Sequence, residues 1–171
     1  MKKPTKESIR IAGYISEFLN NYVLSQKTDS MNTLKSYRDT LALYLTYLEE
    51  EKKVQCGSLS ADVFHHTVIE EWLVWLQKSR KNSPDSCNNR LAALRAFLKY
   101  LSGRDAAYLH LYLEASEIPR RKCLKKKVEG LTREAVKALM EAPDPSSKCG
   151  RRDLAFIILL YSTAARLDEI L

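Results

Sequence analysis

The sequence predicts an all-α protein, on the basis of three observations. Only five glycines and five prolines occur in 171 residues, and neither residue interrupts the long periodic segments. Apolar residues recur every three or four positions, which is the repeat of one helix face. Helix-capping residues and charged breaks separate these segments. We therefore expect a bundle of helices.

Five helices are expected in the first 117 residues, and the fourth has the clearest boundaries. Ser83 can cap that helix and Pro84 suits its first position, while Gly103 is expected to end it after Ser102. In the last of the five, Leu109, Tyr112 and Leu113 are expected to face the core. The expected helices lie at about 11–22, 34–48, 66–78, 84–102 and 106–116.

Basic and polar side chains form a strip beside the apolar stripe of two of these helices. On a helix, positions three or four apart share a face, so each strip would point outward next to the core. A DNA major groove admits a helix, and Arg, Asn and Lys suit contacts to guanine, adenine and phosphate. An ordinary solvated helix face is the alternative. The candidate DNA-binding residues are Lys35, Arg38, Asn88, Arg90, Arg95 and Lys99.

A basic linker is expected at residues 118–130. It contains Pro119, and six of the eight residues from Arg120 to Lys127 are basic. A dense run of like charges repels itself, and a preceding proline interrupts regular structure, so this segment is not expected to fold compactly. A flexible connection and contact with a DNA backbone are compatible interpretations. The candidate phosphate contacts are Arg120, Arg121, Lys122, Lys125 and Lys126.

The segment 131–171 begins a second helical region. Thr132 can cap its first helix, and residues 154–161 are apolar on every side, as in a helix that is buried all round. We expect this apolar helix to lack most of its natural cover. Arg166 follows it and needs a partner, which can be Glu169 or an external anion such as phosphate.

The composition limits the possible partners and site types. A net charge of +7 favours a polyanionic partner, with nucleic acid as the leading candidate. The four cysteines form no Cys-x-x-Cys pair, and the histidines (His65, His66 and His110) show no ligand spacing, because adjacent helix positions point apart. We expect no metal site, no membrane association and a cytoplasmic location.

Four motifs in order resemble the tyrosine recombinases, the phage-integrase and XerC/XerD-like family. This resemblance implies a SAM-like core-binding bundle over 1–117, a linker over 118–130 and the start of a catalytic domain over 131–171. Ala164 stands where the family prefers glycine. The motifs are Thr33-Leu34-Lys35-Ser36-Tyr37, Asn89-Arg90-Leu91-Ala92-Ala93-Leu94-Arg95-Ala96-Phe97, Leu131-Thr132-Arg133-Glu134 and Thr163-Ala164-Ala165-Arg166-Leu167-Asp168-Glu169-Ile170-Leu171.

The resemblance also implies a function, which is site-specific DNA recombination or integration through a phosphotyrosyl intermediate. Arg166 would contact the scissile phosphate, with Glu169 as its acidic neighbour. No cofactor, metal or small-molecule substrate is implied; the partners would be double-stranded DNA and further recombinase protomers. The tyrosine nucleophile would lie beyond Leu171, so we expect this chain alone neither to cleave nor to join DNA. The alternatives are a non-catalytic helical DNA-binding regulator and a helical protein-interaction module.

Overall fold

The computed structural model describes residues 3–27, 30–124 and 129–170, and the chain divides into two compact units, Met1–Leu124 and Lys125–Leu171. Every regular element in the described residues is helical, which confirms the predicted all-α class. The first unit continues through Leu124 and so includes the first residues of the segment expected to be a linker. Its elements are α1 (Lys6–Glu17), the π-helical η1 (Phe18–Lys27), α2 (Met31–Glu50), the short 3₁₀ turns η2 (Cys56–Ser58), η3 (Ala61–Phe64) and η4 (Ala106–Tyr108), α3 (His66–Lys78), α4 (Pro84–Arg104) and α5 (Leu109–Glu117).

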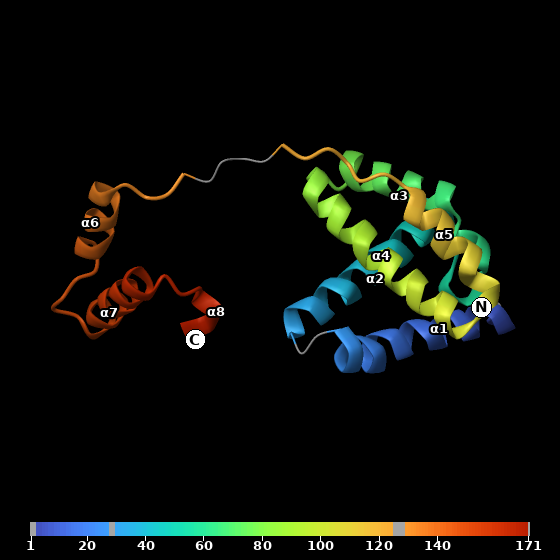
Figure 1. Ribbon diagram of the computed structural model, residues 1–171, viewed down its shortest axis with the longest axis horizontal. Coiled ribbons are helices and arrows are strands. Elements are labelled where there is room, and N and C mark those ends of the chain that lie inside the picture. The colour runs from blue at the N-terminus through green and yellow to red at the C-terminus, as the bar shows by residue number, and fades with distance from the viewer. Residues whose placement is uncertain (1–2, 28–29, 125–128, 171) are drawn as a thin grey trace. The chain divides into compact units, whose positions relative to one another are not determined.

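Helix α4 is the centre of the first unit and packs against α2, α3 and α5 (Figure 1). Phe97 is fully buried on α4, where its ring contacts Phe18 at 5.5 Å and Phe64 at 5.8 Å between ring centroids. The Tyr44 ring on α2 meets the Trp72 ring of α3 edge to face at 4.9 Å. Aromatic side chains from several elements therefore share one core.

The start of α4 follows the prediction, but its end does not. The Ser83 side chain accepts a hydrogen bond from Ser86 N at 3.2 Å, and Pro84 occupies the first turn. The helix passes through Gly103 and ends after Arg104, because Asp105 is extended and its carboxylate accepts from Ala107 N to begin the next turn. The prediction that Gly103 ends this helix after Ser102 is therefore wrong.

The core-facing side of α5 was predicted correctly at Tyr112, which packs against the core, but not at Leu109 and Leu113. Leu109 and Leu113 are 47% and 54% exposed, whereas Tyr108, Leu111 and Ala115 are buried. The η4 turn places Tyr108 in the core before α5 begins, and the Tyr108 hydroxyl accepts a hydrogen bond from Arg10 at 2.9 Å. Both stripes are apolar in the sequence, so periodicity alone did not distinguish them.

The first predicted helix changes its winding at Phe18. The segment Phe18–Lys27 is π-helical, and Phe18 and Val23, five positions apart, are both fully buried. In a π-helix the backbone hydrogen bonds join residues five apart instead of four. Residues five apart can therefore face the core together, which they do not in an α-helix. The winding therefore differs from the expected α-helix beyond Phe18, but the expected apolar face is confirmed through residue 22, because Leu19 and Tyr22 pack against the core.

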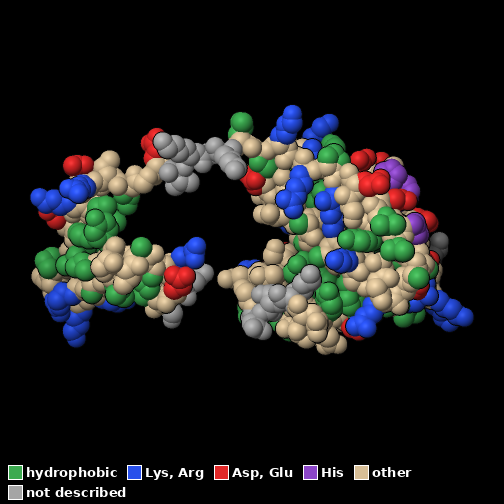
Figure 2. Space-filling view, viewed as in Figure 1, with side chains coloured by type: hydrophobic (Ala, Val, Ile, Leu, Met, Phe, Trp, Pro, Cys, Tyr) green, Lys and Arg blue, Asp and Glu red, His purple; other side chains and the backbone are tan. Residues whose placement is uncertain are grey.

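The second unit contains α6 (Arg133–Glu141), α7 (Lys148–Thr163) and α8 (Leu167–Ile170). Ser147 caps α7 by accepting from Gly150 N at 2.8 Å. Gly150 lies so close to Asp144 that a Cβ atom there would be 1.9 Å from the Asp144 carbonyl oxygen. Apolar side chains, among them Ile158 and Leu159, remain exposed within this unit, and Figure 2 shows hydrophobic side chains at its surface.

Within the described ranges, no helix combines the length and the apolarity needed to cross a membrane.

Candidate nucleic-acid interface

A polar groove lies between the first half of α2 and the first half of α4. Its volume is about 290 Å³. Lys35 contributes positive charge from α2 and Arg90 contributes it from α4, opposed by the single carboxylate of Asp39. The groove is lined by Asn32, Lys35, Ser36, Asp39, Thr40, Ser86, Asn89 and Arg90.

Arg90 has unused hydrogen-bonding capacity in this groove. Its side chain is half-buried, and its Nε atom is buried with no hydrogen-bond partner among the described residues. A buried donor without an acceptor costs free energy, and an arginine offers its remaining donors as a fork that fits phosphate oxygens. Lys35 is exposed across the groove. The pair is therefore suited to holding an anion that lies along the groove.

Arg38 on α2 and Lys99 on α4 are also exposed, as the strip prediction requires. Figure 2 shows lysine and arginine side chains grouped on the visible face of the first unit. Exposed Lys and Arg side chains can reach the phosphate oxygens of a duplex. Both residues remain candidates for contact with DNA.

Asn88 and Arg95 instead make hydrogen bonds within the protein. Asn88 donates to the Arg121 carbonyl at 2.9 Å and accepts from Arg121 N at 2.8 Å. Arg95 Nε donates to the Ala115 carbonyl at 2.6 Å, and its Nη2 donates to the Ile118 carbonyl. Burial lowers the pKa of the Arg95 guanidinium. Both side chains hold the chain that leaves α5, so the strip contains structural residues as well as candidate DNA contacts.

The basic segment after α5 is described in part. Arg120 and Lys122 are exposed, while Arg121 is half-buried with its backbone held by Asn88. Lys125 and Lys126 lie outside the described residues. This segment is thus held against α4 at Arg121, while Arg120 and Arg121 also line a pocket with side chains of α3.

Arg166 and Glu169 meet at the start of α8 in the second unit. The Glu169 carboxylate accepts from Arg166 N at 2.8 Å, and its other oxygen lies 3.4 Å from Arg166 Nη1. The first contact is one half of a capping box, in which the third residue of a helix binds the backbone of the cap. The Arg166 side chain is 87% exposed, so this ion pair leaves most of its donors free to bind an external anion.

Comparison with known proteins identifies the family of this chain. Residues 15–105, which are more than half of the chain and include both walls of the groove, match the family model described as the phage integrase N-terminal SAM-like domain. The chain belongs to this phage integrase family. The resemblance seen in the sequence motifs is thereby confirmed.

Curated relatives extend the match of this phage integrase family member over most of its length. A putative integrase/recombinase, y4rC, of Sinorhizobium fredii is 30% identical over 94% of the chain and 48% of the relative. Tyrosine recombinase XerD of Pseudomonas putida is 31% identical over 91% of the chain and 49% of the relative. The chain spans about half the length of these relatives. No solved structure was found to match it.

Six polar residues of the groove were not among the predicted site residues. Five of them, Asn32, Ser36, Thr40, Ser86 and Asn89, carry no charge, Asp39 is negative, and the strips were sought mainly by positive charge. Asn89 does open one of the family motifs, so its position in that motif was the available signal. Ser86 belongs to the first turn of α4, where its backbone N–H donates to the cap residue Ser83, and no sequence signal marked it as a groove residue.

Ala164, which stands where the family prefers glycine, adopts the left-handed conformation, with φ 51° and ψ 21° at the end of α7. This conformation costs an L-residue about 1–2 kcal/mol. We expect Ala164→Gly to stabilise the second unit by about 0.5–1 kcal/mol, after the entropic cost of glycine. Hydrogen exchange of the α7 amides measures the change.

The matched control for this substitution is Ala155→Gly, which makes the same change inside α7. There glycine gains nothing from left-handed freedom and should destabilise the helix by about 1 kcal/mol. If the α7 amides exchanged faster in both variants than in the unsubstituted chain, the backbone strain inferred at Ala164 would be contradicted.

Proposed function

We propose that this chain is the DNA-binding part of a site-specific tyrosine recombinase, which integrates or recombines DNA by strand exchange through a phosphotyrosyl intermediate. The observation that carries this proposal is the cationic groove between α2 and α4, where Lys35 and an incompletely bonded Arg90 face each other. It lies inside the segment that matches the family. The names of the curated relatives, integrase/recombinase and tyrosine recombinase, support the same function.

In this proposal the first unit binds duplex DNA through Lys35, Arg38, Arg90 and Lys99. Arg120 and Lys122 extend the contact along the backbone, together with Lys125 and Lys126. Phosphate contacts fix the position of a protein on the duplex, and Arg90 or Asn89 can read a base edge if a helix enters the major groove. Asn88 and Arg95 keep their structural roles.

Arg166 in the second unit would contact the scissile phosphate. Its fixed charge and exposed donors suit the stabilisation of charge that develops on phosphate oxygens as a tyrosine attacks. Glu169 would orient Arg166 through the contacts described above. We place the proposed activity in a multimer of recombinase protomers on DNA in the cytoplasm.

The test is DNA affinity as a function of salt, measured by fluorescence anisotropy with a labelled duplex. We expect the logarithm of the association constant to fall linearly with the logarithm of salt, with a slope near −0.9 per phosphate neutralised. The double variant Lys35→Ala/Arg90→Ala should bind more weakly, with a slope smaller in magnitude by about 2.

The charge-matched control is Lys6→Ala/Lys78→Ala, which removes two exposed cations from α1 and α3. It should retain most of the affinity and the slope. DNA affinity that does not depend on salt, or an equal loss of DNA affinity in both double variants, would show that the groove is not the binding surface.

A further inference from the structure

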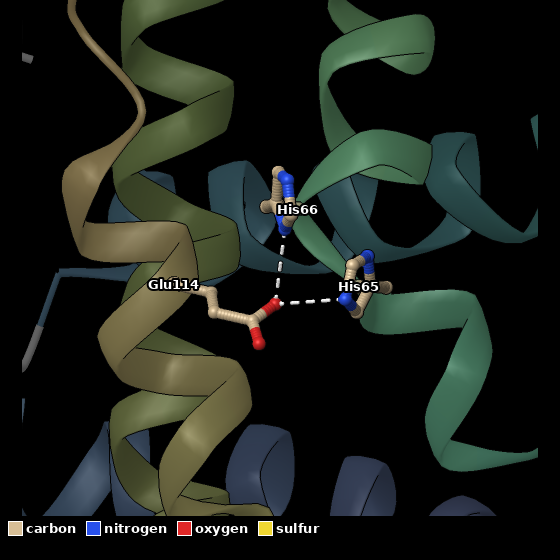
Figure 3. Close-up of side chains that lie close together, drawn as sticks. All are labelled: His65, His66 and Glu114. Atoms are coloured by element: carbon tan, nitrogen blue, oxygen red, sulfur yellow. Dashed lines mark hydrogen bonds and ion pairs between the residues drawn. The ribbon is translucent and has the colours of Figure 1, made fainter.

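His65, His66 and Glu114 converge at the junction between η3 and α3, where α5 passes alongside (Figure 3). The sequence argument that adjacent helix positions point apart is wrong here, because His65 precedes the helix. Its φ of −62° and ψ of 146° are extended, and α3 begins at His66. The two imidazole rings can therefore lie with centroids 4.4 Å apart and both address one carboxylate.

The separations match those between ligands of one metal ion. His65 Nε2 lies 3.3 Å and His66 Nδ1 3.1 Å from the same oxygen, Oε2 of Glu114. Zinc bonds to His nitrogen and carboxylate oxygen are about 2.0–2.1 Å long, so two tetrahedral ligands stand about 3.3 Å apart. All three candidate donor atoms lie within 4.8 Å of one another. A small shift of each side chain would place an ion between them.

The surroundings support the chemistry that binding requires. His65 Nδ1 lies 3.2 Å from Thr67 Oγ1, so this ring nitrogen has a partner while Nε2 faces Glu114. Metal-bound histidines commonly use their second nitrogen in this way. The hydrogen bond with His66 lowers the pKa of the Glu114 carboxyl group, which keeps it ionised. The three side chains are 33–44% exposed, so an ion can reach them from solvent.

We propose that His65, His66 and Glu114 form a binding site for one divalent transition-metal ion, with Zn²⁺ as the best-matched ion. Two imidazoles and one carboxylate are ligands that zinc accepts, and solvent water completes the coordination. The ion would join the start of α3 to α5, whose end leads into the chain held by Arg95 and Asn88. The ion would thus link two helices of the first unit at a place separate from the proposed DNA contacts.

The experiment is calorimetric titration of the 171-residue chain with Zn²⁺, after alkylation of its cysteines to remove thiolate ligands. We expect one equivalent to bind and the melting temperature of the first unit to rise. Glu114→Gln and His66→Ala should each weaken binding at least about ten-fold.

The matched control is His110→Ala, which removes the exposed histidine of α5 that lies outside the cluster. It should bind Zn²⁺ as the unsubstituted chain does. Glu114→Gln preserves shape and replaces a partly exposed side chain, so it tests the site without unfolding the protein. Absence of binding by the alkylated chain, or binding that Glu114→Gln and His66→Ala leave unchanged, overturns the proposal.

Discussion

Replacement of Phe97 by alanine is expected to lower the free energy of unfolding of the first unit by about 3–5 kcal/mol. Phe97 is fully buried on α4, and its ring contacts Phe18 of η1 and Phe64 of η3. The substitution removes these contacts and leaves a cavity between elements that are distant in sequence. Because domain stabilities are commonly about 5–15 kcal/mol, this loss is a large part of the total. Denaturant unfolding followed by circular dichroism measures it.

The control for this prediction is Phe156→Ala in α7. Phe156 is only half-buried and belongs to the second unit, so the unfolding midpoint of the first unit should not change. The ring of Phe97 would not be a central core group if its loss cost less than about 1 kcal/mol. An equal effect of Phe156→Ala would instead mean that the two units unfold together.

The fold class, the bounds of α3 and the start of α4 could be predicted because they depend on local signals. Ser83 and Pro84 define the start of α4 through hydrogen bonding and a fixed φ, whatever the rest of the chain does. The register of α5 could not be predicted in this way, since Leu109 and Leu111 are equally apolar. The choice between them depends on the η4 turn and on the contact between Tyr108 and Arg10.

In the candidate site, too, features set by one helix could be predicted, and features set by packing between helices could not. Charge and spacing predicted that Lys35 and Arg38 face outward, because an exposed strip follows from helix geometry. The intramolecular role of Arg95 depends on where the end of α5 lies, which the sequence of α4 does not contain. The meeting of His66 and Glu114, 48 residues apart, is likewise a product of packing.

Arg95→Ala is expected to destabilise the first unit by about 2–3 kcal/mol, because two carbonyl groups lose hydrogen bonds from a partly buried cation. Proteolysis near Ile118 should accelerate as the chain after α5 is released. Lys99→Ala, one turn along the same strip, should change stability by less than about 0.5 kcal/mol and weaken DNA binding instead. Denaturant unfolding, limited proteolysis and anisotropy distinguish the two effects. If Arg95→Ala left stability intact and lowered only DNA affinity, Arg95 would be a groove contact, and the structural role assigned here would be wrong.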